Sequence, residues 1–304
     1  MQFVFANSSR EIATSANSWV STTGWFYQQL TDTSAKELYQ EMAKPENWFT
    51  GVYTGKKVLC QETYATEDEA ADKVGAIAKG LVWAVRHDQP EIFWLNWDRV
   101  SLGYDWDKDT QQLSVYPVVF GADNAYHADY TNATADIVQP AYEALIAKTD
   151  SIMAEMATAL NGNNTVYAKV DFLNWWLIQN NIYSPDTSLG EINNKRTAYN
   201  AIMSNNDPQN GPVCIGCSYG MQLLAKVAGL TSIIIDGTVV KDGSNIQHGW
   251  NRVQNSDEKW YDTDSTWNDS ESVPTVTKHF FFMIGVNTDT QLKHRYTVRL
   301  SENL

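Results

Sequence analysis

Residues 211–230, G-P-V-C-I-G-C-S-Y-G-M-Q-L-L-A-K-V-A-G-L, constrain the fold of this chain more than any other stretch. Gly211 and Pro212 indicate a loop, and the apolar residues that follow recur at helical spacing until Gly229, where a helix is expected to end. Cys214 therefore stands at the start of a predicted helix. The free N–H groups and the positive end of the helix dipole favour a thiolate there, and the thiolate is the form that attacks carbonyl carbon.

A histidine and a carboxylate follow on two predicted strands, over residues 246–253 and 259–264, joined by the polar loop Q-N-S-D-E. A hairpin centred on Ser256 is expected to place three pairs opposite each other: Arg252 and Trp260, Trp250 and Asp262, and His248 and Asp264. Paired Cβ atoms lie about 5 Å apart on one face, within reach of an imidazole-to-carboxylate hydrogen bond. The sequence thus predicts a Cys-His-Asp constellation of the kind used in nucleophilic catalysis.

Charge and composition exclude several classes of protein. The net charge of −14, with no basic cluster to offset it, argues against nucleic-acid binding. A hydrophobic content of 43% and an aromatic content of 12% indicate a folded protein. Three cysteines are too few for a disulfide framework. We find neither a signal peptide nor a stretch long and apolar enough to span a membrane, which predicts a cytoplasmic protein or a mature chain.

At 304 residues the chain is long for one core, so two domains or one elaborated domain are the leading options. We predict an N-terminal α+β region of unknown role over residues 1–162. It is expected to contain a helix over 34–43, a second helix that begins at a capping box formed by Thr66 and Glu69, and a hairpin within 100–119. A long helix over 135–160 closes this region. The second domain, over residues 163–304, is expected to hold helices over 166–180 and 198–203, the cysteine helix, and strands from residue 233 onward.

Three ordered motifs carry a resemblance to a known family. The run around Cys214, the H-G-W-N at His248 and the W-Y-D-T-D-S-T-W-N-D around Asp264 together resemble the transglutaminase-like (papain-like cysteine peptidase) superfamily, in particular its bacterial branch. The resemblance covers roughly residue 166 to the end. It implies an α+β core in which the cysteine helix packs on an antiparallel sheet, and it favours Cys214 over Cys217 as the nucleophile. The chain departs from the family's pattern at Cys217, where tyrosine is usual, and at Ser265, where proline is common.

The resemblance also implies a function. Cys214 would attack an amide or peptide bond, His248 would act as general base and acid, and Asp264 would orient His248. A cysteine peptidase or amidase is preferred to a crosslinking transglutaminase, with no metal and no organic cofactor. The expected partner is a peptide or protein, a cell-wall peptide being one option, at an extracellular or cell-surface location. The alternative is a non-catalytic module that binds a peptide or glycan, since a fold does not secure an activity.

Other residues have weaker signals. Tyr199, in the segment before the nucleophile, and Trp250, beside the histidine, are candidates for substrate binding, although tryptophans more often serve packing. Cys214 and Cys217 also form a C-x-x-C pattern, which we rank below the nucleophile interpretation because no second pair completes a zinc site. Four further histidines lack a partner in the sequence and are expected to be structural: His87, His127, His279 and His294.

Overall fold

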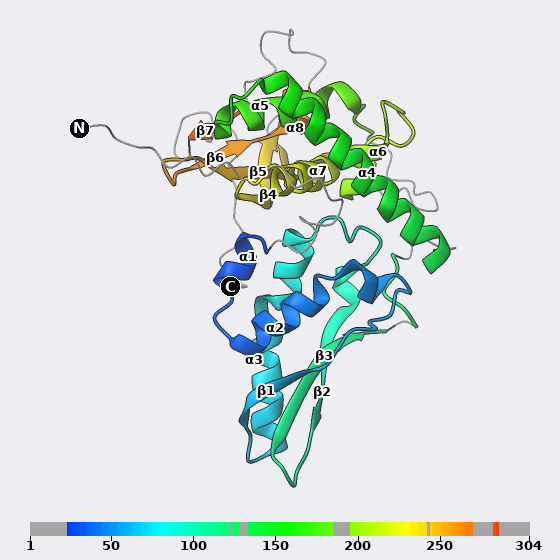
Figure 1. Cartoon of the computed structure of the whole chain (residues 1–304), viewed down its shortest axis with the longest axis vertical. Helices are drawn as coiled ribbons and strands as arrows, with labels where there is room; N and C mark the ends of the chain where they lie inside the picture. The colour runs from blue at the N-terminus through cyan, green and yellow to red at the C-terminus, as the bar shows by residue number, and fades with distance from the viewer. Residues whose placement is uncertain are drawn as a thin grey trace, which may run out of the picture.

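The computed structural model describes residues 23–121, 123–127, 133–184, 195–241, 244–269 and 282–285. The chain has a mixed α+β fold with two antiparallel sheets and several helices, as the sequence predicted at that level. Figure 1 shows an elongated molecule in which the N-terminal part (residues 23–127) lies below the C-terminal part (residues 133–285). Each part contains one of the sheets.

The N-terminal part contains a three-stranded sheet of order β1-β3-β2 with helices packed on it. Its elements are α1 (Trp25–Gln29), α2 (Thr33–Met42), the 3-10 helix η1 (Pro45–Trp48), β1 (Val58–Thr63), α3 (Glu67–Asp88), the 3-10 helix η2 (Trp97–Arg99), β2 (Val100–Trp106) and β3 (Gln112–Val119). The predicted capping box is confirmed, because Thr66 and Glu69 each accept the other's backbone N–H at the start of α3. The predicted hairpin is formed by β2 and β3.

The C-terminal part contains a four-stranded antiparallel sheet of order β4-β5-β6-β7, with α7 packed on β4 and β5. Its elements are α4 (Ala135–Leu160), α5 (Val166–Asn180), α6 (Ala198–Met203), α7 (Cys214–Val227), β4 (Ser232–Lys241), β5 (Ser244–Gln254), β6 (Trp260–Thr263), α8 (Ser265–Asn268) and β7 (Ile284–Gly285). Gly229 follows α7 with φ +71°, a left-handed conformation that suits glycine at a helix end.

The register of the β5–β6 hairpin corrects our prediction. Arg252 pairs with Asp262 instead of Trp260, so the strands are displaced by two residues from the predicted pairing. The loop lies one residue further along the chain than predicted: its centre is Asp257 instead of Ser256, and Glu258 adopts a left-handed φ of +62° within it. A two-residue displacement leaves every side chain on its predicted face, because the pleat has a period of two.

The two parts of the chain share a continuous hydrophobic core and buried polar contacts. The ammonium of Lys226, near the end of α7, lies 2.5 Å from Gln89 Oε1 and 2.6 Å from Glu91 Oε1 in the loop after α3. Helix α4 contacts both parts, since Tyr142 packs against Trp94 whereas α4 also packs on α5, α6 and α7. The predicted domain boundary after residue 162 therefore follows a helix that packs against both parts of the chain, and this boundary stays a prediction.

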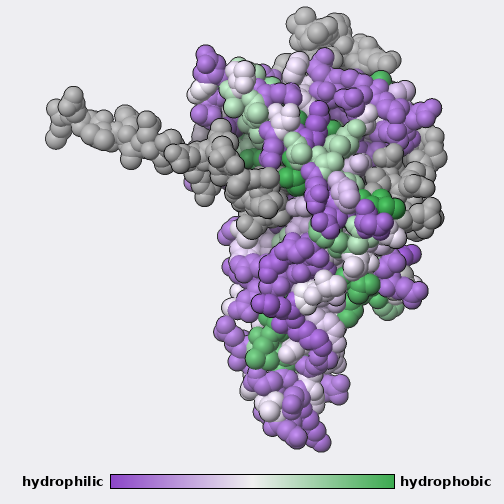
Figure 2. All heavy atoms as spheres, turned by 45° about the vertical axis from the view of Figure 1, so that its right-hand side comes forward, coloured by the Kyte–Doolittle hydropathy of each residue, from purple (hydrophilic) through white to green (hydrophobic). Residues whose placement is uncertain are grey.

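Most of the face shown in Figure 2 is hydrophilic, with hydrophobic side chains in small separate groups. In the described residues, none of the helices has both the length and the apolar composition that a membrane crossing needs. The same residues hold no group of three or more His, Cys, Asp or Glu side chains placed to bind a metal ion.

Candidate active site

Cys214 is the first residue of α7, as the sequence predicted, and its side chain is partly exposed. Two backbone contacts fix this helix end. The N–H of Val213 donates to the carbonyl of Lys195 at 2.9 Å, and a Cβ placed on Gly216 would lie 2.2 Å from the same oxygen. Only glycine allows so close an approach, so the glycine two residues after the cysteine has a steric reason.

His248 and Asp264 form a buried hydrogen bond of 2.6 Å between Nε2 and Oδ2. His248 lies on β5, and Asp264 follows β6 as the N-cap of α8, where its Oδ1 accepts the N–H of Trp267 at 3.0 Å. Both carboxylate oxygens are therefore engaged. The two side chains are only 3% and 2% exposed, which shields the pair from water.

The Cys214 thiol lies beside His248 and interacts with it, so the structure brings all three predicted catalytic residues together. Because Nε2 is bonded to Asp264, the nitrogen left to the thiol is Nδ1. Burial raises the pKa of the Cys214 thiol, but the hydrogen bond and charge of His248, with the N–H groups of Gly249 and Ile215, outweigh burial and lower it. Burial lowers the pKa of His248, but the Asp264 carboxylate and the thiol outweigh it and raise that pKa. The arrangement thus favours a thiolate beside an imidazolium.

Gly249 lets β5 approach the cysteine helix. A Cβ on this residue would lie 3.0 Å from Ile215 Cδ1 and 3.3 Å from Ser218 Oγ. The H-G-W-N motif therefore places a small residue between the histidine and the helix. Asn251, two residues later on β5, donates to the carbonyl of Ser218 at 3.0 Å and fixes β5 against α7.

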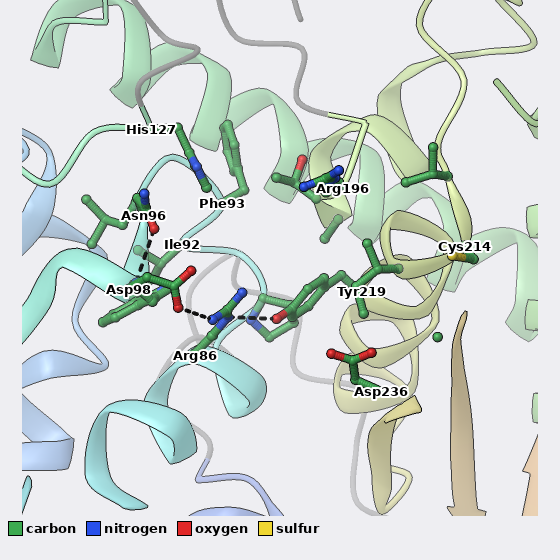
Figure 3. A pocket seen from close by; sticks show the side chains of 18 of the residues that line it. Arg86, Ile92, Phe93, Asn96, Asp98, His127, Arg196, Cys214, Tyr219 and Asp236 are labelled. Carbon is green, nitrogen blue, oxygen red and sulfur yellow. Dashed lines mark hydrogen bonds and ion pairs between the residues drawn. The ribbon is translucent and has the colours of Figure 1, made fainter. Parts of the chain in front are cut away.

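The Cys214 side chain lines a cavity of about 930 Å³ between the two parts of the chain (Figure 3). One wall comes from the C-terminal part, including His248 and Tyr219. The opposite wall comes from the N-terminal part, including Arg86 and Phe93. A cavity of this size accommodates several residues of a peptide or a comparable ligand.

The two predicted substrate-binding residues do not line this cavity. Trp250 is 1% exposed and stacks behind His248 at 6.0 Å between ring centroids, while Trp267 stacks against the same imidazole at 4.9 Å. The structure therefore corrects the expectation for Trp250, whose burial leaves no surface for a substrate. Tyr199 stacks on Phe93 at 4.5 Å and so supports a cavity wall from behind.

Cys217, His87 and His127 differ in where the structure places them. Cys217 is buried, and burial raises the pKa of its thiol to about 12, so this thiol belongs to the core. His87 is buried against Trp83, and burial lowers its pKa to about 3, as suits a structural histidine. His127, also expected to be structural, lines the cavity instead. His279 and His294 lie outside the described residues.

Sequence reasoning missed the cavity wall of the N-terminal part. Arg86 belongs to α3, far from the cysteine motif in the chain, and its Nε donates to the hydroxyl of Tyr219 on α7 at 3.1 Å. Its Nη1 forms an ion pair with Asp98 Oδ1 at 2.9 Å. In the sequence, Arg86 is a basic residue near the end of a helix. Basic residues are common there because they stabilise the helix dipole, so this position gave no signal of a role in the cavity.

The chain matches no protein-family model, and no curated protein is similar to it. Among solved structures, the chain is similar to a crystal structure of a candidate cysteine protease from Cytophaga hutchinsonii, with 11% sequence identity and a TM-score of 0.31. That alignment covers 56% of this chain and 62% of the other, so it spans less than two thirds of that protein.

Proposed function

We propose that this protein is a cysteine hydrolase that cleaves amide or peptide bonds, with Cys214 as nucleophile and His248 and Asp264 as its partners. One observation carries the proposal: a thiol at a helix start, beside a buried histidine that a carboxylate holds, lines an open cavity. The three ordered motifs that resemble the transglutaminase-like superfamily support the same assignment, together with a core in which a cysteine helix packs on an antiparallel sheet.

The geometry suits a two-step acyl transfer. The Cys214 thiolate attacks the carbonyl carbon, and the electron pair of the C=O bond moves to oxygen. His248 then protonates the leaving nitrogen, the C–N bond breaks, and an acyl-thioester remains on the enzyme. In the second step His248 takes a proton from water, and the resulting hydroxide displaces the thiolate to release a carboxylic acid. Asp264 stabilises the imidazolium in both steps.

Backbone N–H groups would stabilise the oxyanion. The first turn of a helix has N–H groups without intrahelical partners, and Cys214 and Ile215 occupy that turn of α7. The N–H of Gly249, on β5, also interacts with the thiol.

Substitution of the cysteine tests the proposal. Cys214→Ala should abolish release of amines from a broad peptide library, and Cys217→Ala is the matched control, because it removes a buried thiol from the same helix. Mass spectrometry should locate iodoacetamide on Cys214 at mildly acidic pH in the native protein. If the Cys214→Ala variant retained turnover, or if Cys214 labelled only after denaturation, the protein would be a non-catalytic binding module instead.

Hydrolysis and crosslinking differ in the molecule that accepts the acyl group from the thioester: water in hydrolysis and an amine in crosslinking. We place hydrolysis first, because bacterial members of the superfamily widely use this fold for proteolysis. Incubation of a cleavable peptide with an excess of a primary amine separates the two: a hydrolase releases the free acid, and a transglutaminase yields the amine adduct. A peptide or protein partner, with a cell-wall peptide as one option, and an extracellular location belong to the same proposal.

A further inference from the structure

Arg86 of the N-terminal part and Tyr219 of the C-terminal part meet at the wall of the cavity. The Arg86 Nε donates to the Tyr219 hydroxyl oxygen at 3.1 Å, and Nη1 donates to Asp98 Oδ1 at 2.9 Å. Both Arg86 and Tyr219 line the cavity that holds Cys214 (Figure 3). The two contacts fix the plane of the guanidinium at the cavity wall, so little side-chain entropy remains to be lost when a ligand binds there.

Two hydrogen-bond donors at this wall are not used within the described residues. Arg86 Nη2 has no acceptor among them, and the Tyr219 hydroxyl accepts from Arg86 while its own hydrogen finds no acceptor there. A guanidinium nitrogen and a neighbouring hydroxyl both offer hydrogen, so together they suit a group that only accepts. A carboxylate is such a group, and arginine binds it with short, charge-assisted bonds.

The distance from the sulfur limits where that carboxylate can be. Tyr219 follows Cys214 by five residues on α7, which corresponds to about 7.5 Å along the helix axis. An extended peptide advances about 3.3 Å per residue. The rise is a separation of backbone positions, and a carboxylate one or two residues from the reacting carbonyl spans a separation of this order.

We propose that Arg86 and Tyr219 form a carboxylate-binding subsite, and that the preferred substrate is a short peptide bearing a carboxylate one or two residues from the bond that Cys214 attacks. The proposal rests on the proposed function, since it names the substrate class of that same site.

Other charged residues at the cavity do not reverse this preference. Asp98 is already paired with Arg86 and is 76% exposed at its side chain. Asp236, on β4, also lines the cavity and repels anions, whereas Arg196 lines it and attracts them. These two charges oppose each other, so selection falls to the fixed donor pair.

A pair of matched alkylating reagents tests the subsite directly. Bromoacetyl-glycine and bromoacetyl-glycinamide differ only in the terminal carboxylate, and in both the Cys214 thiolate displaces bromide to form a C–S bond. The diglycine reagents extend the carboxylate by one residue. In the native protein, the acid of at least one length should alkylate Cys214 about tenfold faster than its amide, as one charge-assisted bond provides.

The variants Arg86→Gln and Tyr219→Phe should reduce that acid-to-amide ratio severalfold, because each removes a donor that binds the carboxylate of the acid. Arg99→Gln is the matched control, because it removes the same charge from a neighbouring residue that does not line the cavity. Equal rates for acid and amide at both lengths, or a ratio that Arg86→Gln leaves unchanged, would overturn the subsite.

A second measurement does not depend on the thiol. In the Cys214→Ala variant, nuclear magnetic resonance titration should show that acetyl-diglycine binds more tightly than acetyl-diglycinamide, and Arg86→Gln should remove the difference. If Cys214 resists both alkylating reagents, the proposed function fails, and this titration alone decides on the carboxylate subsite. Equal binding of the acid and the amide would refute it.

Discussion

His248 Nε2 lies 2.6 Å from Asp264 Oδ2 although the two residues are not partners in the β5–β6 ladder. That ladder ends at the pair of Asn251 and Thr263, and Asp264 has already begun the turn into α8. The carboxylate reaches His248 diagonally from the N-cap position, where its second oxygen accepts the Trp267 N–H. One side chain therefore both starts a helix and holds the imidazole.

This double role makes Asp264→Asn an informative change. Asparagine is as good an N-cap as aspartate, so α8 should persist and stability should fall by less than about 1 kcal/mol. The charge beside His248 is lost, however, and the ring can present the wrong nitrogen to the thiol. Turnover should drop by at least about 100-fold. Asp257→Asn, which makes the same chemical change at the exposed ion pair with Lys259, should leave turnover within about twofold.

The pH dependence of thiol alkylation reports on the Cys214–His248 pair. Because the pKa of Cys214 is lowered and that of His248 is raised, a thiolate beside an imidazolium forms at a lower pH than the one at which an ordinary thiol ionises. The iodoacetamide rate should therefore reach half its maximum below the ordinary thiol pKa of about 8.5. In His248→Ala, burial of the thiol is no longer opposed by the ring, and the midpoint should move above that value. If the midpoint in His248→Ala equals that of the unchanged protein, Cys214 and His248 do not form a functional pair.

Close approach of Gly216 to the chain before α7 gives a prediction for stability. In Gly216→Ala the new Cβ would meet the Lys195 carbonyl at 2.2 Å, and backbone must move. We expect a loss of about 1–3 kcal/mol in the free energy of unfolding by urea. Gly75→Ala, inside α3, is the matched control, since nothing lies within 4 Å of its added Cβ. It should instead stabilise the protein by up to about 1 kcal/mol. Equal stability of both variants would contradict the steric argument.

Local signals made the helices predictable. The capping box at Thr66, the glycine after α7 and the loop before Cys214 act within a few residues of each other, so their effects are visible in a single sequence. His248 and Asp264 were found for a related reason: the period of a strand fixes the face of a side chain even where the register is wrong by two residues.

The cavity wall was not predictable, because it depends on contacts between distant residues. Arg86 and Tyr219 are 133 positions apart, and neither has a spacing or motif that points to the other. Trp250 was misplaced for a different reason. The sequence puts it next to the histidine, but alternation along β5 cannot tell whether a bulky side chain faces a cavity or the core.

The buried ion pair of Lys226 and Glu91 gives the last prediction, on how the two parts of the chain hold together. Their side chains are 7% and 0% exposed, and Lys226 also donates to Gln89. In Lys226→Met the Glu91 carboxylate loses its countercharge in a dry environment, so we expect a loss of about 3–5 kcal/mol on unfolding by urea. Adding Glu91→Gln removes the unpaired buried charge, so the double variant should recover much of the lost free energy of unfolding. Because the loop of Glu91 continues into the cavity residues Ile92 and Phe93, the single variant should also raise KM more than it lowers kcat. If the double variant is no more stable than Lys226→Met, the unpaired buried charge is not the cause of the loss.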